Sequence, residues 1–147
     1  MNKNQQPSKQ YTFRKEERLR SRKAIESLFK EGKAFLVYPY RVIYLWENLP
    51  ARFPVQVAFG VSKKYDKRAV KRNLIRRRMR EAYRKNKHLL YDVLQRTNKG
   101  MNLFISYIAK EEATYQMMEV EMKKVIERLC DRCRETNVKK EDVSDQN

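Results

Sequence analysis

Hydrophobic and polar residues alternate along two stretches in the first half of the chain. Every second residue of Tyr40–Trp46 is aromatic or β-branched, and the same spacing recurs in Val55–Val61 after a turn bounded by prolines. A period of two places these side chains on one face of a β-strand. We therefore predict two strands here that pair as neighbours, and a third, short apolar strand over residues 103–108.

Apolar residues at helical spacing predict three helices. They cover residues 16–30, closed by Gly32 as a left-handed cap, then residues 69–87, and finally residues 114–133. The order of helix, strands, helix, strand and helix favours an α/β sandwich, in which helices cover a sheet. We predict one domain over residues 13–134, with disordered tails at 1–12, which is basic, and at 135–147.

The positive charge of the chain is concentrated in its middle. Lysine and arginine number 35 against 18 acidic residues, so the formal net charge is +17, and +11 of it lies between Lys63 and Lys87. Only Asp66 and Glu81 carry negative charge in that stretch. Hydrophobic residues make up 41% of the chain, which is too many for a disordered basic tail. We therefore expect a folded domain that binds a polyanion.

The helix predicted over residues 69–87 carries this charge on one side. At about 100° per residue, seven polar residues fall within an arc of roughly 140°. These residues are Arg72, Asn73, Arg76, Arg77, Arg80, Arg84 and Lys87. Like charges at this spacing repel one another, and arginine binds phosphate with two parallel hydrogen bonds, so we predict a nucleic-acid-binding face rather than a merely solvated one. Glu81 lies outside the arc and is expected to pair with Lys85.

Residues that many enzymes use for catalysis are scarce. The chain has only three glycines, and they lie too far apart for a P-loop or a dinucleotide-binding fingerprint. It has one histidine, His88, so catalysis by a pair of histidines is excluded. Two-metal hydrolysis needs several carboxylates near the scissile phosphate, and the basic stretch offers two. Cys130 and Cys133 lack the second ligand pair of a zinc site and are expected to be reduced thiols. We predict no catalytic residue and no metal ligand in this chain.

The sequence predicts no membrane association. No apolar run approaches the roughly 20 residues that a membrane-spanning helix needs, and the first ten residues lack the apolar core of a secretory signal. We expect a cytoplasmic protein with no membrane partner and no small-molecule substrate.

A specific motif lies between Val61 and Arg84. It reads VSKKYDKRAVKRNLIRRRMREAYR, in which the pair Arg72–Asn73 precedes further arginines and the run Glu81–Ala82–Tyr83. With LFKEG at 28–32, this motif resembles the bacterial ribonuclease P protein component, and the resemblance extends over residues 13–129.

The chain departs from the pattern of that family in four places. The family usually has arginine at the position of Leu74, lysine at Arg76 and phenylalanine at Ile25. The loop at 65–68 is one residue longer and lacks the usual glycine. The change at Leu74 removes one potential phosphate contact, and the loop difference leaves its turn geometry open.

The resemblance implies a two-layer α+β sandwich with a small mixed sheet of about four strands, three helices and a left-handed βαβ crossover. It also implies a subunit of a ribonucleoprotein endoribonuclease, in which a large RNA is the catalyst and the protein alone is inactive. The reaction is the Mg²⁺-dependent removal of the 5′ leader from precursor tRNA, with Mg²⁺ bound mainly by the RNA. The implied partners are therefore the catalytic RNA and precursor tRNA.

The resemblance further implies two sets of binding residues. The set for RNA is Arg72, Asn73, Arg76, Arg77, Arg80, Lys63, Lys64 and Arg84. A cleft between the sheet and the first helix would hold the leader strand, with Phe29 and Tyr44 as stacking platforms. Core packing is the alternative for both aromatic side chains. On composition alone, a ribosomal or other RNA- or DNA-binding protein is the alternative function.

Overall fold

The structure, a computed structural model, describes residues 12–146, with side chains described for residues 12–135. In chain order the elements are the 3-10 helix η2 (Lys15–Glu17), α2 (Arg22–Glu31), β1 (Lys33–Val37), β2 (Tyr40–Trp46), β3 (Val55–Val61), α3 (Ala69–Thr97), β4 (Met101–Tyr107) and α4 (Tyr115–Gln146). The predicted α+β class is confirmed, because the described part of the chain has a mixed sheet of four strands and three α-helices. The basic tail predicted at 1–12 lies outside the described residues, apart from Thr12.

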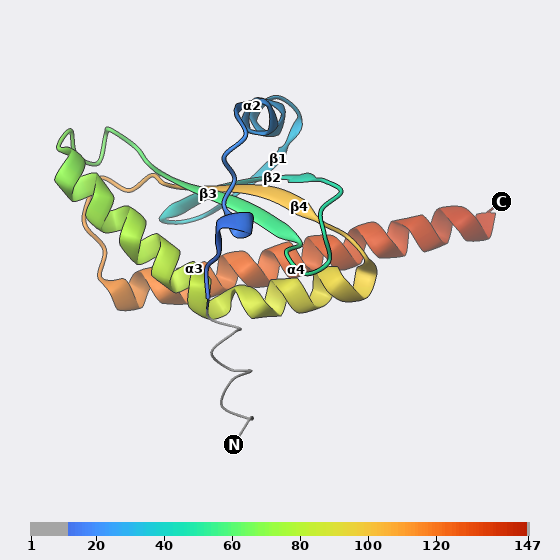
Figure 1. Ribbon diagram of the computed structural model, residues 1–147. Helices are drawn as coiled ribbons and strands as arrows, with labels where there is room; N and C mark the ends of the chain where they lie inside the picture. Colours follow the sequence, from blue (N-terminus) through green and yellow to red (C-terminus); the bar gives the residue numbers. More distant parts are fainter. Residues whose placement is uncertain (1–11, 147) are drawn as a thin grey trace, which may run out of the picture.

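The sheet has the strand order β1-β2-β4-β3 (Figure 1). β2 is antiparallel to both β1 and β4, whereas β3 and β4 are parallel. The prediction that β2 and β3 pair as neighbours is therefore wrong: Met101 of β4 faces Trp46 of β2 on one side and Val55 of β3 on the other. Since parallel strands need a long crossover connection, α3 joins β3 to β4 in a βαβ unit. The left-handed sense of that crossover stays a prediction.

Different helices cover the two faces of the sheet (Figure 1). α3 and α4 pack on each other and over one face, where the larger core contains Tyr40, Val42 and Tyr44 of β2. α2 lies over the other face, where Leu28 packs with Ile43. Successive residues of a strand point to opposite faces, so Ile43 and Tyr44 belong to different cores although they are neighbours in sequence.

The first predicted helix is divided in the structure. Residues 15–17 form η2, and α2 begins after Ser21, whose hydroxyl accepts a hydrogen bond from the Ala24 amide at 3.2 Å. Gly32 follows the last residue of α2 as predicted, but its φ is −70°, so the expected left-handed cap is wrong. Glycine is needed here for space, because a Cβ atom would lie 2.8 Å from Cγ2 of Ile43.

The two long helices extend beyond their predicted ends. α3 continues to Thr97 because Leu90 and Leu94 prolong its buried side, and the left-handed residue Asn98 (φ 55°) ends it. The backbone of α4 is helical to Gln146, through most of the segment assigned to a tail at 135–147, and the domain limits 13–134 stay a prediction. Within the described residues, we find no helix with the length and apolar character needed to cross a bilayer.

Candidate nucleic-acid interface

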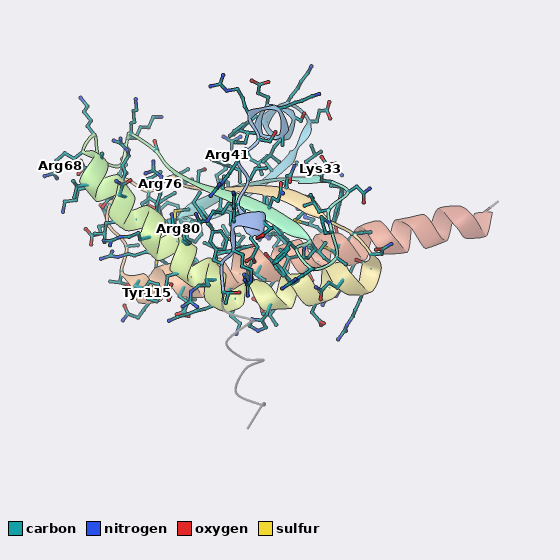
Figure 2. All side chains as sticks on the ribbon, viewed as in Figure 1. Lys33, Arg41, Arg68, Arg76, Arg80 and Tyr115 are labelled. Atoms are coloured by element: carbon teal, nitrogen blue, oxygen red, sulfur yellow. The ribbon has the colours of Figure 1, made fainter. Side chains whose placement is uncertain are left out.

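Cations gather on the exposed side of the first half of α3 and on the loop before it. We call this surface the basic face; its residues are Lys63, Lys64, Lys67, Arg68, Asn73, Arg76, Arg77 and Arg80. All are exposed except Arg76, which is half-buried. Figure 2 shows Arg68, Arg76 and Arg80 following one another along this part of α3. The structure thus brings together six of the eight RNA-binding residues expected from the sequence.

Three arginines of the basic face have no acidic partner among the side chains that the structure describes. Among the described residues, no carboxylate lies within salt-bridge distance of Arg76, Arg77 or Arg80. Arg76 donates instead to the side-chain oxygen of Asn73, at 2.6 Å. This bond holds the Arg76 guanidinium along the helix. A guanidinium that no carboxylate neutralises leaves its charge available to a phosphate.

Arg72 has a structural contact that the helical projection could not show. It is half-buried, and its Nη1 atom donates to the carbonyl oxygens of Asp66 at 2.9 Å and Lys67 at 2.7 Å. Both carbonyls belong to the loop between β3 and α3. Arg72 therefore fastens this loop to the helix, and it positions the lysines of the basic face rather than simply adding a charge to it.

The same loop makes its turn without a glycine. The Ser62 hydroxyl accepts from the Lys64 amide at 3.1 Å, and the Ser62 carbonyl accepts from the Tyr65 amide at 3.0 Å. A serine side chain that bonds to the backbone two residues later stabilises a turn. Because no loop residue between Ser62 and Arg68 has a positive φ, the glycine usual in the family is not required here.

Asp66 closes the loop against the start of α3. Its carboxylate accepts from the Arg68 amide at 2.8 Å and from the Arg68 guanidinium at 3.1 and 3.0 Å. These hydrogen bonds lower the pKa of Asp66 from 3.8 to about 2, and those from the Arg68 side chain have the largest effect. The only acidic group of the loop is thus neutralised by its own neighbour.

Arg84 lies next to Glu81 rather than facing open solvent. Its guanidinium donates to the Glu81 carboxylate at 3.0 and 2.5 Å, and hydrogen bonding to Arg84 lowers the pKa of Glu81. The expected pair of Glu81 and Lys85 is therefore wrong; the Lys85 ammonium lies instead 5.4 Å from the centre of the Tyr115 ring. Arg84 is thus paired with a carboxylate of its own helix.

Lys87 does not belong to the exposed arc, which corrects the helical projection. It is 3% exposed, and its Nζ atom donates to the Glu17 carboxylate and the Thr12 carbonyl. Burial is the largest effect on the pKa of Lys87 and lowers it. The projection gave the angle of Lys87 correctly, but the N-terminal segment with η2 covers that part of the helix.

Phe29 and Tyr44 lie on opposite faces of the sheet, so they do not form one cleft. Tyr44 is 4% exposed and packs in the core between the rings of Phe35 and Trp46, each 6.1 Å away between centroids. Phe29 is 53% exposed on α2, and its ring lies 5.0 Å from that of Phe104. For Tyr44 the alternative of core packing is correct, because its position in β2 faces α4.

The residue that accompanies Phe29 is Phe104, which sequence reasoning did not single out. A row of cross-strand partners lies beside it, namely Leu36, Arg41, Ser106 and Gly60. A Cβ atom on Gly60 would lie 2.7 Å from the Phe104 ring, so the glycine makes room for that ring. We call Phe29, Leu36, Arg41, Gly60 and Phe104 the sheet surface beside α2. Figure 2 shows Arg41 on the side of the sheet where α2 lies.

The two cysteines are buried free thiols on α4. Burial raises the pKa of both, that of Cys133 to about 12. Thiols with raised pKa values are poor nucleophiles and poor metal ligands. Among the side chains described, no group of three or more His, Cys, Asp and Glu residues is placed to hold a metal ion.

An arginine-rich helix face on an α+β domain is typical of nucleic-acid-binding proteins. Comparison with known proteins identifies the family, because the Ribonuclease P family model matches residues 13–130. This chain therefore belongs to the ribonuclease P protein family. It is 41% identical to the ribonuclease P protein component of Porphyromonas gingivalis over 115 residues, which cover 78% of this chain and 84% of the relative. A second relative, from Chlorobaculum tepidum, is 44% identical over 75 residues, or 48% of each chain.

Solved structures agree with the fold. The RNase P protein from Thermotoga maritima has a TM-score of 0.61 at 23% identity, and the match covers 76% of this chain and 96% of that one. The Staphylococcus aureus RNase P protein gives 0.59 at 17% identity, with coverage of 76% and 93%. The arrangement of three helices on a four-stranded mixed sheet is thus that of known RNase P proteins.

Proposed function

We propose that this protein is the protein subunit of ribonuclease P and that it binds the catalytic RNA of that ribonucleoprotein, in the cytoplasm, through the basic face. One observation carries the proposal. Arg76, Arg77 and Arg80 stand together on α3 without carboxylate partners among the described residues, in a chain of the ribonuclease P family. Their mutual repulsion in the free protein is relieved when phosphates lie between them.

The chemistry of the basic face suits a phosphate backbone. A guanidinium offers two parallel N–H donors to one phosphate, whereas an ammonium acts as a point charge. The face has arginines on the rigid helix and lysines on the loop before it, so the helix would set the register of the RNA and the loop would add attraction. Each phosphate that is neutralised releases counterions, which makes the affinity depend on salt.

We assign the hydrolysis to the RNA partner and expect the protein alone to be inactive. The two acids of the basic stretch, Asp66 and Glu81, are both hydrogen-bonded to arginines of this chain. Phosphodiester hydrolysis by two metal ions needs several carboxylates around the ions, and the described side chains offer no such set near the basic face. These observations support Mg²⁺ sites in the RNA, with the protein holding the two RNA partners in position.

We further propose that the 5′ leader of precursor tRNA lies on the sheet surface beside α2. Phe29 and Phe104 offer aromatic faces there, and Arg41 adds an exposed positive charge in the neighbouring row of the sheet. A positively charged surface with aromatic platforms binds a single strand with little sequence preference, at about 1–3 kcal/mol for each stacked base. Phe104 replaces Tyr44 as the second platform.

A cleavage assay on precursor tRNA tests the function. Protein alone, the candidate catalytic RNA alone, and both together are compared at low Mg²⁺. We expect cleavage at the mature 5′ end to be fastest with both components and absent with protein alone. Cleavage by the protein alone, or no gain when the protein is added to the RNA, would contradict the proposal.

A further inference from the structure

A cavity outside the basic face lies between the N-terminal segment, the turn that follows β2, and the second half of α3. Its volume is about 270 Å³, and its lining includes Arg14, Arg52, Phe53, His88, Tyr91 and Gln95. This volume is many times the roughly 30 Å³ that one water molecule occupies in the liquid. The cavity therefore has room for one small planar group.

The floor of the cavity is a rigid polar network. Oε1 of Glu17 accepts from the ammonium of Lys87 and, at 2.5 Å, from the hydroxyl of Tyr91. Oε2 of Glu17 accepts from the Arg14 amide at 2.6 Å. Both carboxylate oxygens are thus engaged, and the Tyr91 ring is held in one orientation at the wall.

The rim of the cavity is cationic and partly aromatic. Arg14 and Arg52 are exposed, and the Arg52 guanidinium lies 5.2 Å from the centre of the Phe53 ring. Asp92 is an acidic group at the rim, and its carboxylate pairs with Arg96 at 2.9 Å. A planar base can stack on the pair of Arg52 and Phe53, and a phosphate can bind the two rim arginines.

The cavity continues the charged side of α3. Arg84, His88, Tyr91 and Gln95 are spaced by four, three and four residues, which places them along one side of the helix. An RNA strand bound to the basic face and extended along α3 reaches the cavity about one helical turn beyond Arg84. A nucleotide from the same RNA partner is accordingly the ligand whose chemistry fits best.

We propose that this cavity takes up one nucleotide of an RNA partner, with its base stacked against Phe53 and its phosphate at Arg14 and Arg52. This inference rests on the proposed function for the identity of the RNA. The nucleotide can come from the catalytic RNA or from precursor tRNA, which offer the same chemistry.

NMR with adenosine 5′-monophosphate (AMP) tests the site directly. His88 is the only histidine of the chain, so its imidazole signals need no further assignment. We expect AMP to shift these signals in a saturable way and to bind more tightly than either inorganic phosphate or adenosine. Arg52→Gln and Phe53→Ala should each weaken AMP binding about fivefold or more. Arg22→Gln, which removes the same charge from the exposed side of α2, should change it less than twofold.

Three outcomes would overturn the site. These are the absence of any His88 shift at millimolar AMP, equal affinity for phosphate and AMP, and an Arg52→Gln affinity equal to that of the unmodified protein. Phe53→Leu separates stacking from packing, because leucine fills the space without an aromatic face. If Phe53→Leu binds AMP as well as the unmodified protein, base stacking is wrong. Thermal melts of each variant confirm that the fold is kept.

The source of the nucleotide follows from the affinity of Phe53→Ala for each RNA. If Phe53→Ala weakens binding to only one of the two RNAs, that RNA supplies the nucleotide; if it weakens binding to both, both can supply it. Unchanged binding to both RNAs overturns the inference. Cleavage by the unmodified ribonucleoprotein tests the proposed function separately. If no nucleotide binds in the cavity, the cleavage assay still decides whether the proposed function is correct.

Discussion

Glu17 and Lys87 form a buried ion pair between segments 70 positions apart in the chain. Lys87 also donates to the carbonyl of Thr12, and the Tyr91 hydroxyl donates to Glu17. The N-terminal segment is thereby fastened across α3, and it forms one wall of the cavity next to the basic face. A lysine that periodicity assigns to the RNA surface is instead a structural anchor.

We expect Lys87→Ala to lower the free energy of unfolding by about 3–5 kcal/mol, because the Glu17 carboxylate would stay buried without its counter-ion. Urea denaturation followed by circular dichroism measures this loss. Lys85→Ala is the matched control: Lys85 is exposed on the same helix, and its removal should cost less than about 1 kcal/mol. Equal losses in the two variants would show that the buried pair contributes nothing particular.

The Asp66 carboxylate should titrate well below an ordinary aspartate. Its pKa in the folded protein is lowered to about 2 by the hydrogen bonds from Arg68. A group whose pKa is lowered on folding stabilises the folded loop above its ordinary value of 3.8, and this effect is lost as the pH falls toward 2. A carbon-13 NMR titration of the carboxyl measures the pKa directly.

The variant Arg68→Ala should return the Asp66 pKa toward its ordinary value, whereas Lys67→Ala should leave it low. Lys67 is the matched control because it is an exposed neighbour whose side chain makes none of the hydrogen bonds to Asp66. If Asp66 of the unmodified protein titrates like an exposed aspartate, Arg68 does not close the loop.

Periodicity predicted individual strands well, and it failed on their order. The bounds of β2 and β3 match because burial on one face produces a period of two. Their separation by β4 depends on the parallel crossover through α3, which leaves no trace in either strand. The pattern of residues does not predict β1 as a separate strand. All four residues of 34–37 are apolar, so hydrophobic and polar positions do not alternate there.

In the candidate site, too, the sequence predicts what depends on one helix but not what depends on contacts with other segments. The helical projection places Arg76, Arg77 and Arg80 on one side of α3, and in the structure Arg77 and Arg80 are exposed there and Arg76 is half-buried. Lys87 and Arg72 differ because the N-terminal segment and the loop before α3 contact them. Tyr44 could have been placed correctly from the sequence, since the alternation of β2 groups it with the buried Tyr40 and Val42.

Arg77 and Arg72 should respond differently to substitution, because one is exposed and the other fastens the loop. We expect Arg77→Ala to weaken binding to the catalytic RNA and to lower the slope of log affinity against log salt by about one unit. The melting temperature should not change. Arg72→Ala should weaken binding and also lower the melting temperature, since the loop carbonyls of Asp66 and Lys67 lose their donor.

The charge-conserving variant Arg72→Lys separates the two roles of that residue. A lysine keeps the charge, but its single ammonium on a different stem does not reproduce the guanidinium contacts to both carbonyls. We expect little recovery of RNA affinity or melting temperature. Full recovery of affinity and melting temperature by lysine would mean that Arg72 acts only through its charge. For the other variant, Arg77→Ala, an unchanged slope of log affinity against log salt would show that Arg77 does not contact the RNA.

Phe29 and Tyr44 should separate leader binding from folding. Phe29→Ala removes an exposed ring from the sheet surface beside α2, so it should weaken binding of precursor tRNA with a leader about fivefold or more and leave tRNA without a leader unaffected. Tyr44→Ala creates a cavity in the core and should lower the free energy of unfolding by about 3–5 kcal/mol. Affinities for the two RNAs and urea denaturation are measured on both variants. If Phe29→Ala weakens both RNAs equally, or if Tyr44→Ala impairs only leader binding with its stability intact, then the leader does not lie on this surface.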